Sequence, residues 1–345
     1  MAAASPTTSA ETPTQRRLTD SHGRVIHDLR VSVTDRCNYK CIYCRTGEYG
    51  AQYPELAIEE YLRLIKLFVG LGIEKVRLTG GEPLLRNGLI PLIQELASLR
   101  TTSGQHLDIA LTTNGHLLDK MAAPLKQAGL NRVTVSMDAV DAPTFERITR
   151  VPGSFHKVLA GIRAAKAAGL TPLKINCVLL RGFNDNEIEG FARFAREEDV
   201  VVRFIEFMPL EEGRLWTPEI VVPLNEIVSR ISREMPLVPV AAREPSETAR
   251  RYTFSDGIGE IGIIAPVSQA FCGACSRVRL TSDGKIRTCL FSQVEHDLYG
   301  RMRAGQSDAE LSTYIVRTIN EKEARHHIGE PGFMKPSRSM VHIGG

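Results

Sequence analysis

The sequence lacks a long apolar run and a strong net charge, and these two absences exclude several classes of protein. No stretch of about 18 apolar residues is present, so a membrane-spanning helix is not expected. The opening residues also lack the apolar segment of a secretory signal, which predicts a cytoplasmic protein. Lys and Arg number 43 against 40 Asp and Glu, and the resulting +3 gives no general attraction to nucleic acid or anionic membranes.

The first 20 residues are predicted to be a disordered lead, since they are rich in Ala, Ser and Thr. An organelle transit peptide is the alternative for this segment, and Glu11 disfavours it. With 43% hydrophobic residues in a chain of 345, the remainder can bury a sizeable core.

Short β-branched segments alternate with amphipathic segments from residue 28 to about residue 235, which is typical of β/α units around parallel strands. The expected strands begin at Leu29, Lys75, Asp108, Asn131, Pro172 and Val201. A closed barrel of this type needs eight strands, so these units predict an α/β fold that is a partial (β/α)6 TIM-type barrel. We expect this barrel to span residues 21–240 and to be followed by a C-terminal region at 241–345.

Each expected strand has one apolar and one polar face, because side chains alternate along a strand. Leu29 and Val31, for example, oppose Arg30. If helices cover the apolar faces, the polar faces line an interior cavity that contains Arg30, Arg77 and Lys174. Such a cluster of cations favours a multiply charged anion such as a triphosphate. The alternative is a sheet with one face in water.

Six of the seven cysteines form two clusters, which indicates metal binding or catalysis in an intracellular protein. Cys37, Cys41 and Cys44 form CxxxCxxC, directly after the first expected strand. Cys272 and Cys275 form CxxC, and Cys289 follows. Structural zinc normally takes four protein ligands, whereas three cysteines suit an iron–sulfur cluster with one open iron. Cys177 lies on the apolar face of its strand and is predicted to be a buried hydrophobe.

The CxxxCxxC motif with an aromatic residue, Tyr43, before its last cysteine resembles the signature of the radical S-adenosylmethionine (SAM) enzymes. TGGEP at 79–83 resembles the turn that binds the methionine amine in that superfamily. VTDRCNYKCIYC, KVRLTGGEPLLR, LTTNG, RFIEFM and SQAFCGACSRVRLTSDGKIRTCLF together resemble the GTP 3′,8-cyclase family of molybdenum cofactor biosynthesis. The resemblance runs from about Leu29 to the terminal Gly344-Gly345. It departs after the third cysteine, where the family has Met-Pro and this chain has Arg45-Thr46.

The resemblance implies two [4Fe-4S] clusters and SAM as cofactors, with the second cluster carried by the C-terminal region. The first cluster would be held by Cys37, Cys41 and Cys44, and the second by Cys272, Cys275 and Cys289. The residues matching SAM contacts are Tyr43, Gly81, Ser136 and Met208. The residues matching GTP contacts are Arg30, Arg77, Thr112, Lys174, Arg277 and Arg279, of which Arg277 and Arg279 would also be catalytic together with the first three cysteines.

The implied reaction begins with cleavage of SAM to methionine and a 5′-deoxyadenosyl radical, which removes hydrogen from C3′ of GTP. The new radical would attack C8 of guanine and give 3′,8-cyclo-7,8-dihydro-GTP, while the double-glycine tail reaches into the active site. The implied partners are an electron donor and the next enzyme of the pathway, with a homodimer left open and no nucleic acid or membrane partner. Two alternatives stay open, namely a peptide-modifying radical SAM maturase and a zinc-stabilised binding protein without catalysis.

Overall fold

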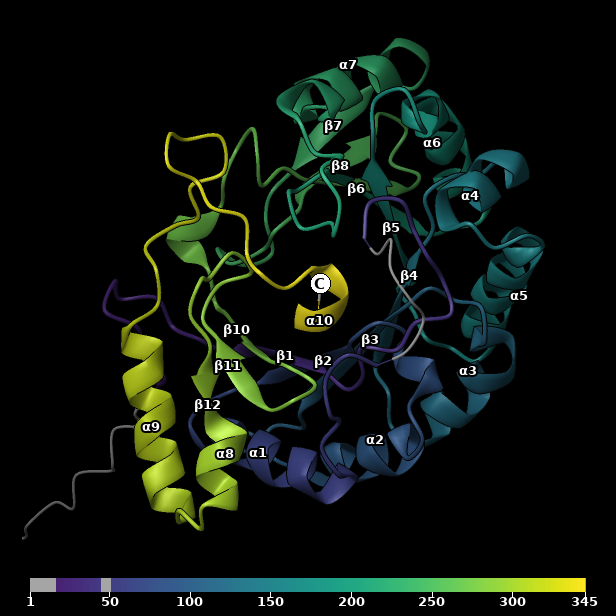
Figure 1. Cartoon of the computed structure of the whole chain (residues 1–345). Coiled ribbons are helices and arrows are strands. Elements are labelled where there is room, and N and C mark those ends of the chain that lie inside the picture. The colour runs from purple at the N-terminus through teal and green to yellow at the C-terminus, as the bar shows by residue number, and fades with distance from the viewer. Residues whose placement is uncertain (1–16, 45–50, 345) are drawn as a thin grey trace, which may run out of the picture.

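A computed structural model describes residues 17–44 and 51–344, and its strands form one twelve-stranded sheet that curls around a central space (Figure 1). The six predicted strands are all present, in the predicted order and parallel. They are β1 (Asp28–Ser32), β2 (Lys75–Thr79), β3 (Asp108–Thr113), β4 (Arg132–Ser136), β5 (Lys174–Leu179) and β6 (Val201–Glu206). The predicted α/β partial barrel is therefore confirmed.

Helices cover the outside of this sheet (Figure 1). They are α1 (Ile58–Gly70), α2 (Leu89–Ser98), α3 (Leu118–Gln127), α4 (Ala142–Thr149), α5 (Ser154–Ala167), α6 (Ile188–Glu197) and α7 (Leu224–Glu234). In α1 the buried side chains recur at three- and four-residue spacing, from Tyr61 to Val69. The helix is followed by Gly72, which has a φ of +107°, a backbone conformation that favours glycine.

The C-terminal region extends the same sheet on both sides, which the sequence did not predict. β9 (Glu260–Ile264) pairs in parallel with β6, and β10 (Arg277–Leu280) pairs in parallel with β1. Antiparallel strands complete the two edges: β7 (Leu237–Val240) and β8 (Arg250–Phe254) beyond β9, and β11 (Lys285–Arg287) and β12 (His296–Asp297) beyond β10. This pairing places the second cysteine cluster beside the beginning of β1.

The last part of the chain turns back into the sheet. Two helices, α8 (Leu298–Arg303) and α9 (Asp308–Asn320), lie on the outside, and the short α10 (Met340–Ile343) lies in the interior (Figure 1). Val341 and Ile343 are buried there. The C-terminal tail is therefore surrounded by the strands of the barrel.

The predicted division of faces is found in the core. Leu29, Val31 and Cys177 are fully buried, and Cys177 is a free thiol packed in the main hydrophobic cluster, as predicted. Of the predicted lead, residues 1–16 lie outside the described residues. Leu18 and Asp20 are buried, so the packed part of the chain begins before the predicted boundary at residue 21. Within residues 17–44 and 51–344, no helix is both long and apolar enough to cross a membrane.

Candidate functional site

A cavity of about 1270 Å³ lies inside the curled sheet, and side chains of both cysteine clusters line it. Every residue that the sequence analysis assigned to the site also lines this cavity. These residues are Cys37, Cys41, Cys44, Tyr43, Gly81, Ser136, Met208, Arg30, Arg77, Thr112, Lys174, Arg277, Arg279, Cys272, Cys275 and Cys289. The structure therefore brings together residues that are up to about 260 positions apart in the sequence.

The loop after β1 carries the first cysteine trio, at the carboxyl end of the strand. Its backbone is attached to the end of α4, because Lys40 N donates to Thr149 O and Ile42 N donates to Ile148 O. Tyr43, between the second and third cysteines, donates a 2.7 Å hydrogen bond from its hydroxyl to the carboxylate of Asp138. Burial raises the pKa of Asp138 to about 6. This contact ties the cysteine loop to the segment that follows β4.

The Gly80-Gly81 turn after β2 packs directly against the start of the same loop. A methyl group added at Gly80 would lie 2.3 Å from Thr34 O, and one added at Gly81 would lie 2.3 Å from Arg36 O. Glu82 then joins this turn to β3, accepting hydrogen bonds of 2.7 Å from Thr113 Oγ1 and from Asn114 N. Only glycine allows this close approach, so the two glycines place the turn against the loop that carries the cysteines.

The second trio comes from two segments that flank the pair of strands β10 and β11 in the sequence. Cys272 and Cys275 bracket a single helical turn, in which Cys275 N donates to Cys272 O at 3.1 Å. Arg277 Nη2 lies 3.3 Å from the sulfur of Cys275. Burial opposes ionisation of this thiol, but the charges of Arg277 and Lys322 outweigh it and lower the pKa of Cys275 to about 7. A lowered pKa favours the thiolate, the form that ligates metals.

The donor sets fit iron–sulfur clusters. All six cysteines are half-buried, and they line the same cavity. Three thiolates leave one iron of a cubane cluster without a protein ligand. Within the described residues, no three His, Cys, Asp or Glu side chains converge closely enough to hold a single metal ion.

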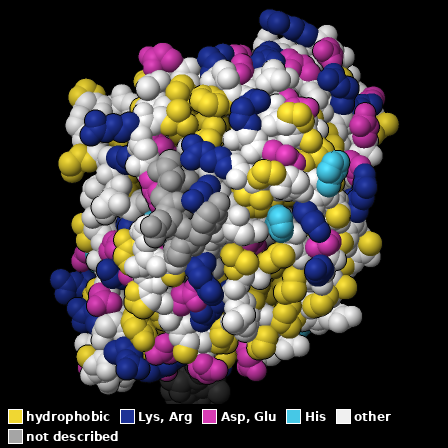
Figure 2. Space-filling model, turned by 45° about the vertical axis from the view of Figure 1, so that its right-hand side comes forward, with side chains coloured by type: hydrophobic (Ala, Val, Ile, Leu, Met, Phe, Trp, Pro, Cys, Tyr) yellow, Lys and Arg dark blue, Asp and Glu magenta, His cyan; other side chains and the backbone are white. Residues whose placement is uncertain are grey.

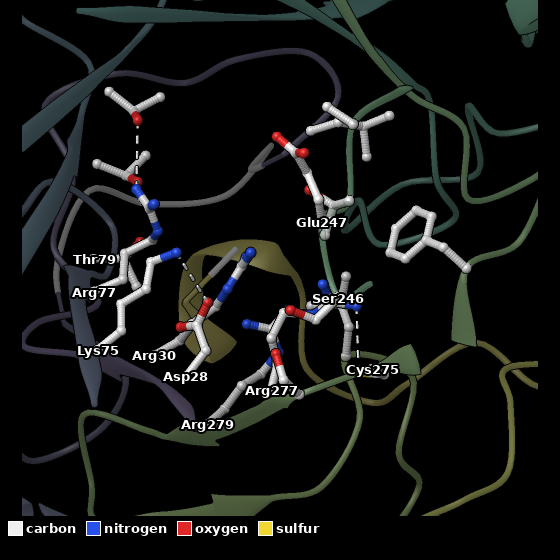
Figure 3. Close-up of a pocket in the computed structure, with 18 of the residues that line it drawn as sticks. Asp28, Arg30, Lys75, Arg77, Thr79, Ser246, Glu247, Cys275, Arg277 and Arg279 are labelled. Carbon is white, nitrogen blue, oxygen red and sulfur yellow. Dashed lines mark hydrogen bonds and ion pairs between the residues drawn. The ribbon is translucent and has the colours of Figure 1, made fainter. Parts of the chain in front are cut away.

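Between the two trios, the cavity wall is strongly cationic. Arg30, Arg77, Arg277 and Arg279 point into the same space from neighbouring strands (Figure 3). Burial, followed by the charge of Arg279, lowers the pKa of Arg30 well below its usual value. Arg30 Nε has no hydrogen-bond partner among the described residues. Buried cations that repel one another are stabilised by a bound anion, so this wall can hold a polyanionic ligand.

A second group of cations continues along β5 and β6. Burial lowers the pKa of Lys174 to about 8, with Arg203 adding to the effect, and burial lowers the pKa of Arg203 to about 9. Arg77 is held in place by a hydrogen bond of 3.1 Å to the hydroxyl of Thr112. On the face shown in Figure 2, by contrast, basic and acidic side chains are interspersed. Positive charge is thus more concentrated in the cavity than on that face.

Several cavity residues were not predicted. Asp28, Lys75 and Arg203 line the cavity, and Lys75 Nζ lies 3.7 Å from the carboxylate of Asp28. They occupy the same strand faces as Arg30, Arg77 and Asn176. The alternation of side chains along the strands could therefore have predicted that they line the cavity. Asp138 was missed because it follows its strand, and its role depends on the contact with Tyr43.

The tail reaches the cavity wall, as the resemblance implied. The carbonyl oxygen of Gly344 accepts a 3.0 Å hydrogen bond from Arg279, and Met340 and Val341 line the cavity. Gly345 and the departure at Arg45-Thr46 lie outside the described residues.

Comparison with known proteins covers most of the chain. Residues 31–195 match the Radical SAM superfamily, and residues 200–328 match Molybdenum Cofactor Synthesis C. A GTP 3′,8-cyclase of Moorella thermoacetica is 43% identical over 331 residues, which are 95% of this chain and 100% of that protein. A GTP 3′,8-cyclase of Corynebacterium glutamicum is 44% identical over 341 residues, 96% of this chain and 90% of that protein.

Among solved structures, SuiB of Streptococcus suis bound to the precursor peptide SuiA has a TM-score of 0.62 to this chain. The match covers 87% of this chain and 67% of SuiB, at 13% sequence identity. At that identity the likeness concerns the fold alone.

Proposed function

Because the chain belongs to the GTP 3′,8-cyclase family, we propose that it converts GTP to (8S)-3′,8-cyclo-7,8-dihydroguanosine 5′-triphosphate. This is a radical SAM reaction of molybdenum cofactor biosynthesis. The observation that carries the proposal is the single cavity lined by both cysteine trios, with a cationic wall between them. The peptide-modifying alternative receives less support, since the relatives from Moorella thermoacetica and Corynebacterium glutamicum, at 43% and 44% identity, are GTP 3′,8-cyclases, whereas SuiB shares only the fold.

In this proposal the two ends of the cavity have different tasks. Cys37, Cys41 and Cys44 hold a [4Fe-4S] cluster, and Tyr43, Gly81, Ser136 and Met208 position SAM beside it. A cluster held by these three cysteines would, once reduced, supply the electron for cleavage of SAM to methionine and a 5′-deoxyadenosyl radical. Cys272, Cys275 and Cys289 hold a second [4Fe-4S] cluster at the end of the cavity that receives guanine.

The cations between the trios bind the triphosphate and orient the ribose. Arg30, Arg77, Lys174, Arg277 and Arg279 supply charge-assisted hydrogen bonds, and Thr112 keeps Arg77 oriented. With GTP held there, hydrogen leaves C3′ to form 5′-deoxyadenosine, and the C3′ radical forms a bond to C8. Uptake of one electron and one proton completes the product. Enclosure by the sheet and the tail protects the radical from solvent.

The reaction needs an electron donor, and its product is a substrate for the next enzyme of the pathway. We place the protein in the cytoplasm, where free thiols persist and GTP is available. A homodimer is compatible with this proposal and is not required by it, since every proposed site residue comes from one chain.

The decisive experiment combines an iron count with turnover. Protein purified without oxygen should contain roughly eight irons per chain, as two cubane clusters require. Incubation with GTP, SAM and dithionite should then release 5′-deoxyadenosine together with a product that has a new ultraviolet spectrum. Zinc without iron would favour the binding-protein alternative. Full iron without GTP-dependent release of 5′-deoxyadenosine would contradict the cyclase assignment.

A further inference from the structure

Lys322 is buried beside the second cysteine trio, with only 3% of its surface exposed. Its ammonium donates hydrogen bonds to two main-chain carbonyl oxygens, those of Arg277 at 3.0 Å and of Thr288. Both acceptors are neutral, so these bonds use two of the three N–H donors without cancelling the charge. A buried cation costs several kcal/mol unless an opposite charge compensates it. Lys322 therefore needs a negative partner in the fold.

The two carbonyls show where that partner lies. Arg277 follows Cys275 by two residues, and Thr288 directly precedes Cys289. One ammonium thus joins the CxxC segment to the distant third cysteine across the β10–β11 hairpin. Lys322 also lines the cavity.

Arg24 supports the same region in a different way. Its guanidinium donates to Cys272 O at 3.0 Å and to Ala324 O at 2.8 Å, so it links the CxxC segment to the turn that follows Lys322. The charge of Arg24 is already cancelled by the carboxylate of Asp20, 2.6 Å away. Arg24 can therefore fix geometry while adding little net charge.

Glu323, the carboxylate next in sequence to Lys322, contacts the side chain of Thr288, whose carbonyl accepts from Lys322. Its Oε2 accepts a 2.7 Å hydrogen bond from the hydroxyl of Thr288. Among the described residues, no carboxylate forms an ion pair with Lys322, whereas the two residues that its ammonium contacts lie within two residues of Cys275 and Cys289 in the sequence. Three thiolates and the cluster they hold are anionic, and each added electron increases the negative charge.

We propose that Lys322 is a positioning residue that supplies the counter-charge of the second thiolate site and holds its two halves together. The inference rests on the second cluster of the proposed function. A fixed positive charge close to a cluster stabilises its reduced form more than its oxidised form. Lys322 should therefore raise the reduction potential of the second cluster as well as favour its assembly.

The test uses the full-length protein, reconstituted anaerobically. Lys322→Gln removes the charge but keeps N–H donors for the two carbonyls, and Lys322→Arg keeps the charge. Lys120→Gln, at an exposed position on α3, is the matched control. The measurements are iron and sulfide per chain, and the midpoint potential of each cluster followed by electron paramagnetic resonance. Iron at the first trio and binding of SAM report whether the barrel is folded.

For Lys322→Gln we expect either loss of about half of the iron or a second cluster with a more negative midpoint potential. The midpoint potential of the first cluster should not change. Lys322→Arg and Lys120→Gln should have iron contents and midpoint potentials close to those of the unchanged protein. In a Cys289→Ala background, Lys322→Gln should remove no further iron.

An unchanged iron content and an unchanged midpoint potential of the second cluster in Lys322→Gln would overturn the role of Lys322 while leaving the proposed function intact. Loss of the second cluster in Lys322→Arg would also overturn it, because the charge is retained there. If the unchanged protein itself holds only about four irons, the proposed second cluster fails, and this inference fails with it.

Discussion

Arg279 Nη1 donates a 3.0 Å hydrogen bond to the carbonyl oxygen of Gly344, so the end of the chain touches the cationic wall of the cavity. Arg279 belongs to β10, and α10 carries Gly344 through the interior of the sheet. Burial, followed by the charge of Arg277, lowers the pKa of Arg279 to about 10. The Gly344 carbonyl therefore stabilises a cation that Arg277 and Arg287 repel.

Gly344→Ala should displace the tail. Gly344 has a φ of +68°, and a methyl group there would lie 2.8 Å from Thr79 Cγ2. Left-handed strain alone costs about 1–2 kcal/mol, so we expect product formation to fall by roughly tenfold or more while iron content is kept. Gly182→Ala is the matched control, because Gly182 also has a positive φ, +77°, but nothing lies within 4 Å. Equal activity of the two variants would argue against the tail contact.

Arg338→Met should destabilise the fold by releasing the tail from its anchor. Arg338 makes two hydrogen bonds of 2.8 Å to the carboxylate of Asp283, and its guanidinium lies 3.8 Å from the centre of the Tyr53 ring. Removing one partner of a buried ion pair costs about 3–5 kcal/mol, which urea unfolding would measure. Arg317→Met, whose side chain is 81% exposed, should change stability by less than about 0.5 kcal/mol.

The same pair predicts a pH dependence of stability. Burial would raise the pKa of Asp283, but Arg338 and Thr281 outweigh it and lower that pKa below 3.8. A lowered folded-state pKa means that this stabilisation is complete above pH 3.8 and is lost as pH falls through the folded value. Arg338→Met should reduce this acid sensitivity. Identical acid-unfolding curves for both proteins would contradict the pairing.

Lys174→Ala should weaken GTP binding by about 1.5–3 kcal/mol, as expected for a charge-assisted contact. Since the pKa of Lys174 is about 8, affinity in the unchanged protein should decline as pH rises from 7 to 9, because the ammonium loses its proton. The variant should lose most of this slope. Isothermal calorimetry with GTP checks both effects, with Lys120→Ala as control. An unchanged affinity would remove Lys174 from the proposed triphosphate site.

Cys289→Ala should lose one cluster's iron, abolish cyclisation and keep some SAM binding. The reason is that Cys289 belongs to the second trio, whereas SAM is assigned to the first. Cys177→Ala is the control, because Cys177 is fully buried away from the cavity and should keep all iron. Iron analysis, SAM binding and product formation separate these outcomes. Full activity of Cys289→Ala would contradict the second site.

Much of the barrel could be predicted because strand alternation is a local property. Arg30 and Arg77 alternate with the apolar Leu29 and Val76, and once helices cover the apolar face this alternation predicts that the arginines face the interior. Asp28, Lys75 and Arg203 follow the same alternation and could have been found in this way. The roles assigned to these side chains stay predictions.

The rest of the site depends on contacts between distant segments, which local patterns do not encode. Nothing in RVRL, the sequence of β10, specifies β1 as its neighbour. Lys322 has the sequence context of a solvated charge after a helix, and its burial results from packing against Arg277 and Thr288. Leu18 belongs to the segment predicted to be a disordered lead and is nevertheless buried, and Ile26 N donates to its carbonyl.

The pairing of β1 with β10 also affects how the chain matures. Asp28 is among the first described residues to leave the ribosome, yet its strand partner Arg277 emerges about 250 residues later. At typical synthesis rates of about 5–20 residues per second, β1 keeps an uncovered backbone edge for more than ten seconds. If the second trio holds a cluster as proposed, delivery of iron to it would await nearly complete translation, whereas the CxxxCxxC loop is available much earlier.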